Sequence, residues 1–274
     1  MTSLRQFAKL CLLLPALALL GASPTLPRVD HVVIVVEENR SLSQIVGSPE
    51  APYINSLIAR GALFTNMHAV THPSQPNYFA MFAGLTDSNR DGCPPAGVNP
   101  NAPNLGSELL ASHRTFVGFA ESMPSVGYTG CKYGRFAQKH TPWVHFNNIP
   151  SADSRPFEAL RSYEQLPTAA MIIPNLDNDM HDGTIAMGDA WLRANIAPLL
   201  QWGWSHHTLF ILTWDEGVDP HNNIPLVFYG PMVKPGRYSD FIDHYSVLRT
   251  LEDIFHVAPT GTAALRKAIT DDWR

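Results

Sequence analysis

The sequence predicts an α/β protein, a three-layer α/β/α sandwich around a mostly parallel sheet. Three observations favour this class. First, short apolar runs alternate with segments of helical periodicity after the N-terminal leader. Second, the apolar runs lack the polar alternation of half-exposed strands, which indicates strands buried on both faces. Third, polar residues capable of chemistry follow those runs directly, where ligands bind in open α/β sheets.

The first strand is expected at 32–36, where five β-branched residues follow one another. Further buried strands are expected at 116–119, 171–173, 209–212 and 226–229. Apolar spacing predicts helices that end at Gly61, begin after Pro76, run from about 184 to 200, and cover 245–255. In the 184–200 helix, four side chains are expected to face the core: Met187, Trp191, Ile196 and Leu199.

Residues 1–22 are expected to be a secretory signal peptide, and 23–274 a single domain. Arg5 and Lys9 precede an apolar run at 10–20 that is too short for a comfortable membrane span, and small residues follow it. The alternative is a buried first helix. The leader predicts a periplasmic or secreted protein without a stable membrane anchor.

The formal net charge of −5 argues against a nucleic acid or an anionic membrane as the partner. This net charge does not exclude a small phosphate ester that binds in a locally positive pocket. The sequence contains no indication of the oligomeric state.

Cys93 and Cys131 are the only cysteines after the leader, and an even pair in an exported chain predicts one disulfide. The alternative is two unrelated buried thiols. A metal site is less favoured because neither cysteine has a Cys or His at ligand spacing. Both lie in 87–138, a stretch rich in Pro, Gly and Asn that we expect to be a long excursion over the active face.

Acidic residues end two of the expected strands. Glu37, Glu38 and Asn39 follow the first strand, and Asp215 and Glu216 follow the strand at 209–212. Carboxylate and amide oxygens are ligands for divalent cations. Four carboxylates at one sheet edge would repel one another unless a cation neutralised them. For either group alone, the alternative is a polar loop.

Ser74 lies between Pro73 and Pro76, where the helix signal begins. A hydroxyl at a helix N-terminus faces free N–H groups and the positive end of the helix dipole, which suits a nucleophile that carries a phosphoryl group. The alternative is a simple N-cap. Asn77, one turn further, could donate to a phosphate oxygen. No Gly-x-Ser-x-Gly elbow surrounds Ser74, so an α/β-hydrolase is disfavoured.

The loop at 174–183 holds Asp177, Asp179 and His181, a density that could ligate a metal or orient an imidazole as general acid. The alternative is an Asx-rich loop that caps the next helix.

Two further places in the sequence carry candidate substrate contacts. Lys139 and His140, at the end of the excursion, could hold the phosphate or protonate the leaving group. His221 lies in the loop that follows Asp215 and is a further candidate.

Five motifs in a fixed order resemble those of the bacterial phosphoesterase family, which includes acid phosphatases and phospholipases C and has the alkaline-phosphatase-like fold. They lie at 31–41, 72–78, 179–183, 213–217 and 244–249. The resemblance covers nearly the whole chain after the leader. It implies a metal held by Glu38, Asn39, Asp215 and Glu216 near a Ser nucleophile. Glu37 is left out, because adjacent residues of a strand point opposite ways and the family match favours Glu38.

The resemblance also implies roles for other positions. Asn77 matches a phosphate-contacting Asn, His181 an active-site His, and Asp177 a metal ligand of two-metal relatives. Lys139 and His140 match a Lys-His-Asn-Pro segment, from which this chain departs because Thr141 replaces Asn.

The expected activity is that of an exported, metal-dependent phosphoric ester hydrolase, an acid phosphatase with a phosphoserine intermediate. Oxygen ligands with one His fit Ca, Mg, Mn or Zn. The alternatives are a phospholipase C-type phosphodiesterase and a phosphate- or metal-binding protein without turnover. A sulfatase is disfavoured because no Cys-x-Pro-x-Arg occurs.

Overall fold

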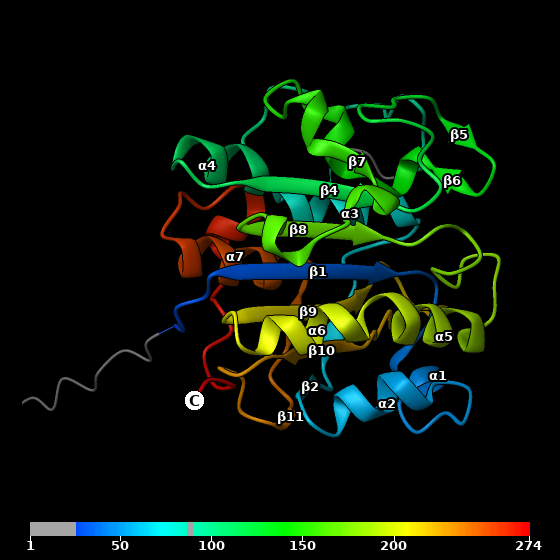
Figure 1. Ribbon diagram of the computed structural model, residues 1–274, viewed down its shortest axis with the longest axis vertical. Helices are drawn as coiled ribbons and strands as arrows, with labels where there is room; N and C mark the ends of the chain where they lie inside the picture. Colours follow the sequence, from blue (N-terminus) through cyan, green and yellow to red (C-terminus); the bar gives the residue numbers. More distant parts are fainter. Residues whose placement is uncertain (1–25, 87–89) are drawn as a thin grey trace, which may run out of the picture.

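A twisted eight-stranded sheet with helices on both faces forms the protein (Figure 1). The computed structural model describes residues 26–86 and 90–274. The expected signal peptide at 1–22 lies outside the described residues. The strand order is β11-β2-β10-β9-β1-β8-β4-β7. The strands are β1 (His31–Glu37), β2 (Ala62–Phe64), β4 (Phe116–Ala120), β7 (Ser154–Pro156), β8 (Ala169–Ile173), β9 (Thr208–Trp214), β10 (Leu226–Tyr229) and β11 (Gly236–Tyr238).

The sheet is mostly parallel, as the sequence predicts. β1 pairs in parallel with β8 and β9, and β4 with β8 and β7. β10 alone in this sheet runs antiparallel, to both β9 and β2. Residues 32–36 of β1 are buried throughout, as expected of a central strand covered on both faces.

Helices cover the two faces of the sheet (Figure 1). One layer contains α3 (Ser74–Ala83), α4 (Leu105–Ala111) and α7 (His244–Phe255). The other contains α2 (Pro52–Ile58), α5 (Ile185–Asn195) and α6 (Ala197–Trp204), with the short α1 (Leu42–Ile45) after β1. Two small sheets complete the fold: β3 (Met67–His68) with β12 (Ile242–Asp243), and β5 (Lys132–Tyr133) with β6 (Phe136–Ala137).

The structure corrects the expected helix at 184–200. It is two helices, α5 and α6, which meet at Ile196. Pro198 in the first turn of α6 explains the break, because proline has no N–H for a continuing helical bond. Met187 was expected in the core but is 43% exposed, since it lies in the outward-facing first turn of α5. Trp191 is buried as expected, and so are Ile196 and Leu199.

Two boundaries also differ from the expectation. α3 begins at Ser74 rather than after Pro76, because proline is tolerated in a first helical turn. The stretch 87–138 is not one excursion, since it contains α4 and the sheet strand β4. The β5 and β6 strands, which follow β4 in the chain, lie toward the end of the sheet where β1 finishes (Figure 1).

The predicted disulfide is confirmed. Cys93 and Cys131 are joined at an S–S distance of 2.06 Å, which ties the segment after α3 to the segment after β4. A disulfide is consistent with an extracytoplasmic protein. Within residues 26–86 and 90–274, no helix is both long and apolar enough to cross a membrane.

Candidate active site

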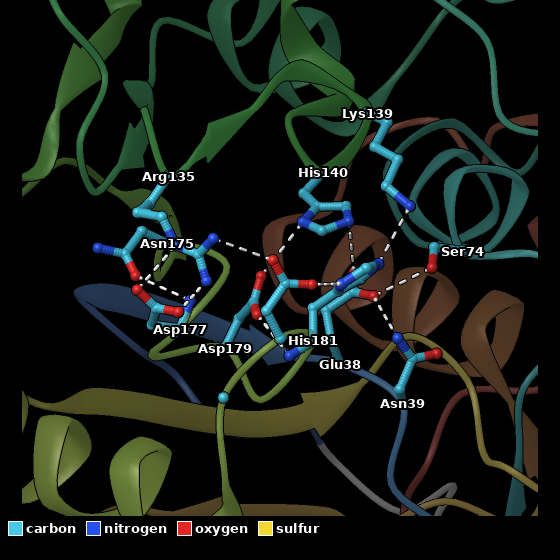
Figure 2. A network of polar contacts seen from close by, with 12 residues as sticks. Glu38, Asn39, Ser74, Arg135, Lys139, His140, Asn175, Asp177, Asp179 and His181 are labelled. Atoms are coloured by element: carbon cyan, nitrogen blue, oxygen red, sulfur yellow. Dashed lines mark hydrogen bonds and ion pairs between the residues drawn. The ribbon is translucent and has the colours of Figure 1, made fainter. Parts of the chain in front are cut away.

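Polar side chains gather at the carboxyl end of the sheet, as expected for an open α/β fold. They come from the ends of β1 and β9, the start of α3, the loop between β8 and α5, and a short 3-10 helix at Gln138–His140. Figure 2 labels residues from each of these segments except the end of β9. These segments are far apart in sequence. The sheet order brings them together, because β1 lies between β8 and β9.

Glu38 is the centre of this cluster and is completely buried. Its Oε2 accepts a hydrogen bond from Ser74 Oγ at 3.0 Å and one from Asn39 Nδ2 at 3.4 Å. Its Oε1 accepts from the Tyr78 hydroxyl at 2.5 Å. Tyr78 is four residues after Ser74, one turn along α3, so both side chains reach Glu38 from the same helix face.

The acids after β9 complete one side of the cluster. Asp215 Oδ1 accepts from the backbone N–H of Asn39 at 3.0 Å. Glu216 Oε1 accepts from Ser74 Oγ at 3.3 Å, and its other oxygen pairs with His72 Nδ1. The hydroxyl of Ser74 therefore lies between two carboxylates from different strand ends.

Two histidines form the other side. His140 is buried, with Nε2 3.1 Å from Glu38 Oε1 and Nδ1 3.2 Å from Asp179 Oδ2. The ligand atoms of Glu38, His140 and His181 all lie within 4.8 Å of one another. The spacing would allow these three residues to hold one metal ion, and Glu38 is shared with the carboxylate side.

The electrostatics of the cluster favour a cation. Burial and the neighbouring Glu216 raise the pKa of Asp215 to about 7, and burial raises the pKa of Asp179 to about 8. Burial also raises the pKa of Glu38 well above its usual value and lowers that of His140 well below. Within the described residues, Asp215 Oδ2 lacks a hydrogen-bond partner, while Asp179 Oδ2 and His140 Nε2 have the ion-pair contacts given above but no hydrogen bond of good geometry. A divalent cation would neutralise the acids and use those atoms, so the residues fit a metal.

Lys139 brings a positive charge to the rim. Its Nζ donates to Asp91 Oδ2 at 2.7 Å and lies 3.4 Å from His181 Nε2 (Figure 2). Asp91 Oδ1 in turn accepts from the backbone N–H of Gln75 at 3.0 Å. Asp91 therefore links the ammonium to the residue that follows Ser74.

Three residues expected at the site have other surroundings. Asp177 was expected as a metal ligand, but it pairs with Arg135, away from Glu38 (Figure 2). His221 was expected to contact substrate, but its ring is exposed, and its hydrogen bonds to His68 and Asp219 run through its backbone.

Asn77 was expected to contact phosphate, but its amide instead holds the loop before α3. Its Oδ1 accepts from the N–H groups of Val70 and Thr71, and its Nδ2 donates to the carbonyls of Thr71 and Pro73. Because these four bonds occupy both amide atoms, Asn77 shapes the turn that presents Ser74.

Tyr78, His72 and Asp91 were not predicted from the sequence. A spacing signal existed for Tyr78, four residues after Ser74 on the expected helix. His72 and Asp91 reach the cluster from loops, and no local spacing rule indicates their partners. Glu37 is buried, and neither of its carboxylate oxygens has a hydrogen-bond partner within the described residues, so it takes no part in the contacts around Ser74.

Fold and site together define the class, a mostly parallel α/β protein with an acid-rich polar site at the carboxyl end of its sheet, and solved proteins of the alkaline-phosphatase superfamily share this fold. A solved member of that superfamily from Vibrio parahaemolyticus aligns with a TM-score of 0.67 over 92% of this chain and 72% of that chain, at 13% identity. The phosphonate monoester hydrolase of Silicibacter pomeroyi aligns with a TM-score of 0.56 over 90% of this chain and 78% of that chain, at 11% identity. At these identities the likeness concerns the fold alone.

The chain belongs to the phosphoesterase family, whose family model matches residues 48–258, and it is a phosphoric ester hydrolase. It is 50% identical over 258 residues to the phosphatidylinositol-3-phosphatase of Mycobacterium tuberculosis, covering 92% of this chain and 85% of that protein. It is 33% identical over 220 residues to an acid phosphatase of Aspergillus fumigatus, covering 71% of this chain. The chain spans about half (48%) of that fungal protein's length.

Proposed function

We propose that this protein is an exported, metal-dependent phosphomonoesterase that works through a phosphoserine at Ser74. One observation carries the proposal: the Ser74 hydroxyl donates to Glu38 at 3.0 Å and lies 3.3 Å from Glu216, at the N-terminus of a ten-residue helix. A hydroxyl hydrogen-bonded to carboxylates can lose its proton as it attacks.

The cation would be held by Glu38, Asn39, Asp215 and Glu216, with the neighbouring His140 as a further ligand candidate, while His181 is assigned to proton transfer. When bound, such a cation lowers the pKa of the serine hydroxyl and neutralises charge on the phosphate. The oxygen-rich donor set fits Ca, Mg, Mn or Zn.

The reaction proceeds in two displacements. Ser74 Oγ forms a bond to phosphorus while the bond to the ester oxygen breaks, and the proton of Ser74 passes to a neighbouring carboxylate. The leaving alcohol takes a proton from His181, whose Nε2 lies beside Lys139 at the rim. His140 is the other candidate proton donor, but its burial lowers its pKa and favours the neutral ring. Water then forms a bond to phosphorus while the bond from phosphorus to Ser74 Oγ breaks. The proton of the water passes to His181, and Ser74 Oγ takes its proton back from the carboxylate as phosphate is released.

A phosphomonoester is favoured over a diester by the names of the relatives, a phosphatidylinositol-3-phosphatase and acid phosphatases. The relative with 50% identity makes a phosphorylated inositol lipid a reasonable candidate substrate. The competing functions are a phospholipase C-type diesterase and a binding protein without turnover.

The test compares wild type with Ser74→Ala on matched mono- and diesters, with and without a chelator. We expect turnover of the monoester, loss of roughly 10⁴-fold or more in kcat for Ser74→Ala, and loss of activity on chelation that added divalent cation restores. Acid quench of wild type with labelled substrate should trap phosphate on Ser74. Wild-type turnover by Ser74→Ala would refute the nucleophile, and full activity after chelation would refute metal dependence.

A further inference from the structure

A cavity of about 370 Å³ adjoins the candidate active site. It shares Lys139 and His181 with the catalytic cluster. By contrast, a larger cavity of about 570 Å³, between 237–246 and 265–271, shares no residue with the cluster. The smaller cavity is lined by Asp91, Gly92, Cys93, Cys131, Lys132, Ala137, Lys139, Leu176, His181 and Asp182.

This cavity lies on the side of the cluster toward which the alcohol would leave. In an in-line displacement at phosphorus, the leaving oxygen lies opposite the attacking Ser74 Oγ. Lys139 Nζ and His181 Nε2, 3.4 Å apart, stand at the boundary between the cluster and the cavity. An alcohol that leaves past His181 therefore enters the space beyond it, and this inference rests on the proposed phosphomonoesterase activity.

The walls of the cavity are of two kinds. The Cys93–Cys131 disulfide, Leu176 and Ala137 supply apolar surface. The disulfide also joins the two loops that carry Asp91 and Lys132. A pocket with covalently joined walls holds its shape and suits a compact ring better than a long flexible chain.

Among the charged side chains that line the cavity, one cationic group is not engaged in an ion pair within the described residues. Asp91 pairs with Lys139 at 2.7 Å, and Asp182 lies 3.1 Å from Arg135 and 2.7 Å from His181 Nδ1. Lys132 lines the same cavity, is exposed, and makes no ion pair within the described residues.

We propose that the cavity is the leaving-group pocket and that Lys132 selects phosphomonoesters whose alcohol carries a second negative charge. The alcohol contacts the disulfide and Leu176, while its anionic substituent pairs with the Lys132 ammonium. Lys132 is a specificity residue on this view, because it touches the part of the substrate that leaves and takes no part in attack on phosphorus.

Two isosteric esters test the proposal: 4-carboxyphenyl phosphate, which carries the second charge, and 4-carbamoylphenyl phosphate, which does not. The measured quantity is the ratio of their kcat/KM values. We expect wild type to prefer the carboxylate, and Lys132→Met to lower this ratio by about three- to fivefold, the range of an exposed ion pair. Lys132→Glu should lower it further. Added salt should reduce the preference of wild type but not that of Lys132→Met.

Lys234→Met is the matched control, because Lys234 is also exposed but does not line this cavity. It should leave the ratio unchanged. An equal ratio in wild type and Lys132→Met, with both esters hydrolysed, would overturn the proposal and leave the phosphatase activity intact. A ratio that falls equally in Lys234→Met would also overturn it, since the effect would then come from net charge. Failure of wild type to hydrolyse either ester would count against the phosphomonoesterase itself.

Discussion

Asp189, on α5, and Asp215, after β9, are both buried carboxylates, but their surroundings differ. Asp189 Oδ1 accepts from the N–H of Ile54 at 2.8 Å, and Oδ2 accepts from the N–H of Tyr53 at 3.1 Å, at the start of α2. Asp215 accepts one backbone N–H, its Oδ2 has no hydrogen-bond partner within the described residues, and its neighbour is another acid.

This difference separates a carboxylate whose acceptors are satisfied within the fold from one that is a candidate cation ligand. Asp189 is satisfied by the free N–H groups of a helix start, an arrangement that stabilises the fold without further ligands. Asp215 has an acceptor atom left over in a place where water is excluded, and such an atom is costly unless something binds it. Burial alone therefore does not mark a site, and neither does a missing partner alone, since Glu37 also lacks one within the described residues. Asp215 is set apart because its free acceptor lies at the strand end that also carries Glu216, a contact of Ser74.

The largest expected effect is on catalysis. Asp215→Asn keeps the shape of the side chain but removes the charge that would hold a cation. We expect kcat/KM for a phosphomonoester to fall by roughly 10²- to 10³-fold. Thermal melts of the metal-free variant should show no loss of stability, because an unpaired buried acid has been removed. Activity within a few fold of wild type would show that Asp215 resembles Asp189 after all.

The stability of the metal-free protein should depend on pH. The pKa values of Asp215 and Asp179 in the folded protein are about 7 and about 8, above the value of about 4 in an unfolded chain. Between about pH 4 and pH 7 the folded state holds protons that the unfolded state has lost. The free energy of unfolding should therefore fall as the pH rises through this window, by up to about 1.4 kcal/mol per pH unit for each proton. Urea unfolding of chelated protein at pH 5, 6 and 7 measures this, and a flat profile would contradict it.

Asp189→Asn should show the opposite pattern to Asp215→Asn. The Asn side chain has one oxygen, which can accept from only one of the N–H groups of Tyr53 and Ile54. Its NH2 group would face the remaining N–H group, and two donors cannot form a hydrogen bond. We expect a loss of about 1–2 kcal/mol in the free energy of unfolding, measured by urea titration. The kcat of the folded variant should equal that of wild type, and a large fall in kcat would remove the contrast between the two acids.

An effect on catalysis smaller than that of Asp215→Asn is expected for Tyr78→Phe. It removes the hydroxyl that donates to Glu38 at 2.5 Å but keeps the ring that stacks on His140 with centroids 5.3 Å apart. Glu38 would be less firmly oriented, and we expect kcat to fall by roughly tenfold with little change in KM. Equal kcat in the variant and wild type would show that Ser74 and Asn39 suffice to orient Glu38.

The sequence predicted those parts of the fold that depend on local pattern. The uninterrupted run at 32–36 is the centre of β1, and the acids after β1 and β9 lie together because strand ends share an edge. The break between α5 and α6 could have been expected from Pro198. The exposure of Met187 could not, because it depends on how the first turn of α5 is oriented.

The sequence predicted many of the residues that gather at the site, but it did not predict which contacts their side chains make. The partner of Asp177 is Arg135, 42 residues earlier, and nothing in the local sequence pairs them. Asn77 stands in a motif, but the direction of its amide is set by the loop at 70–73. Side-chain direction in loops depends on distant packing, so motif position alone does not establish contact with a substrate.

The pairing of β1 with β8 and β9 has a consequence for the order in which the protein can be made. Residues 31–37 leave the ribosome early, but their sheet partners are 169–173 and 208–214. Contacts between such distant segments form slowly, because a long stretch of chain must be ordered before they close. A nascent or truncated chain that stops before 208 has Ser74 and Glu38 but neither Asp215 nor Glu216. Hydrolytic activity would therefore arise only once most of the polypeptide has been synthesised and the centre of the sheet has closed.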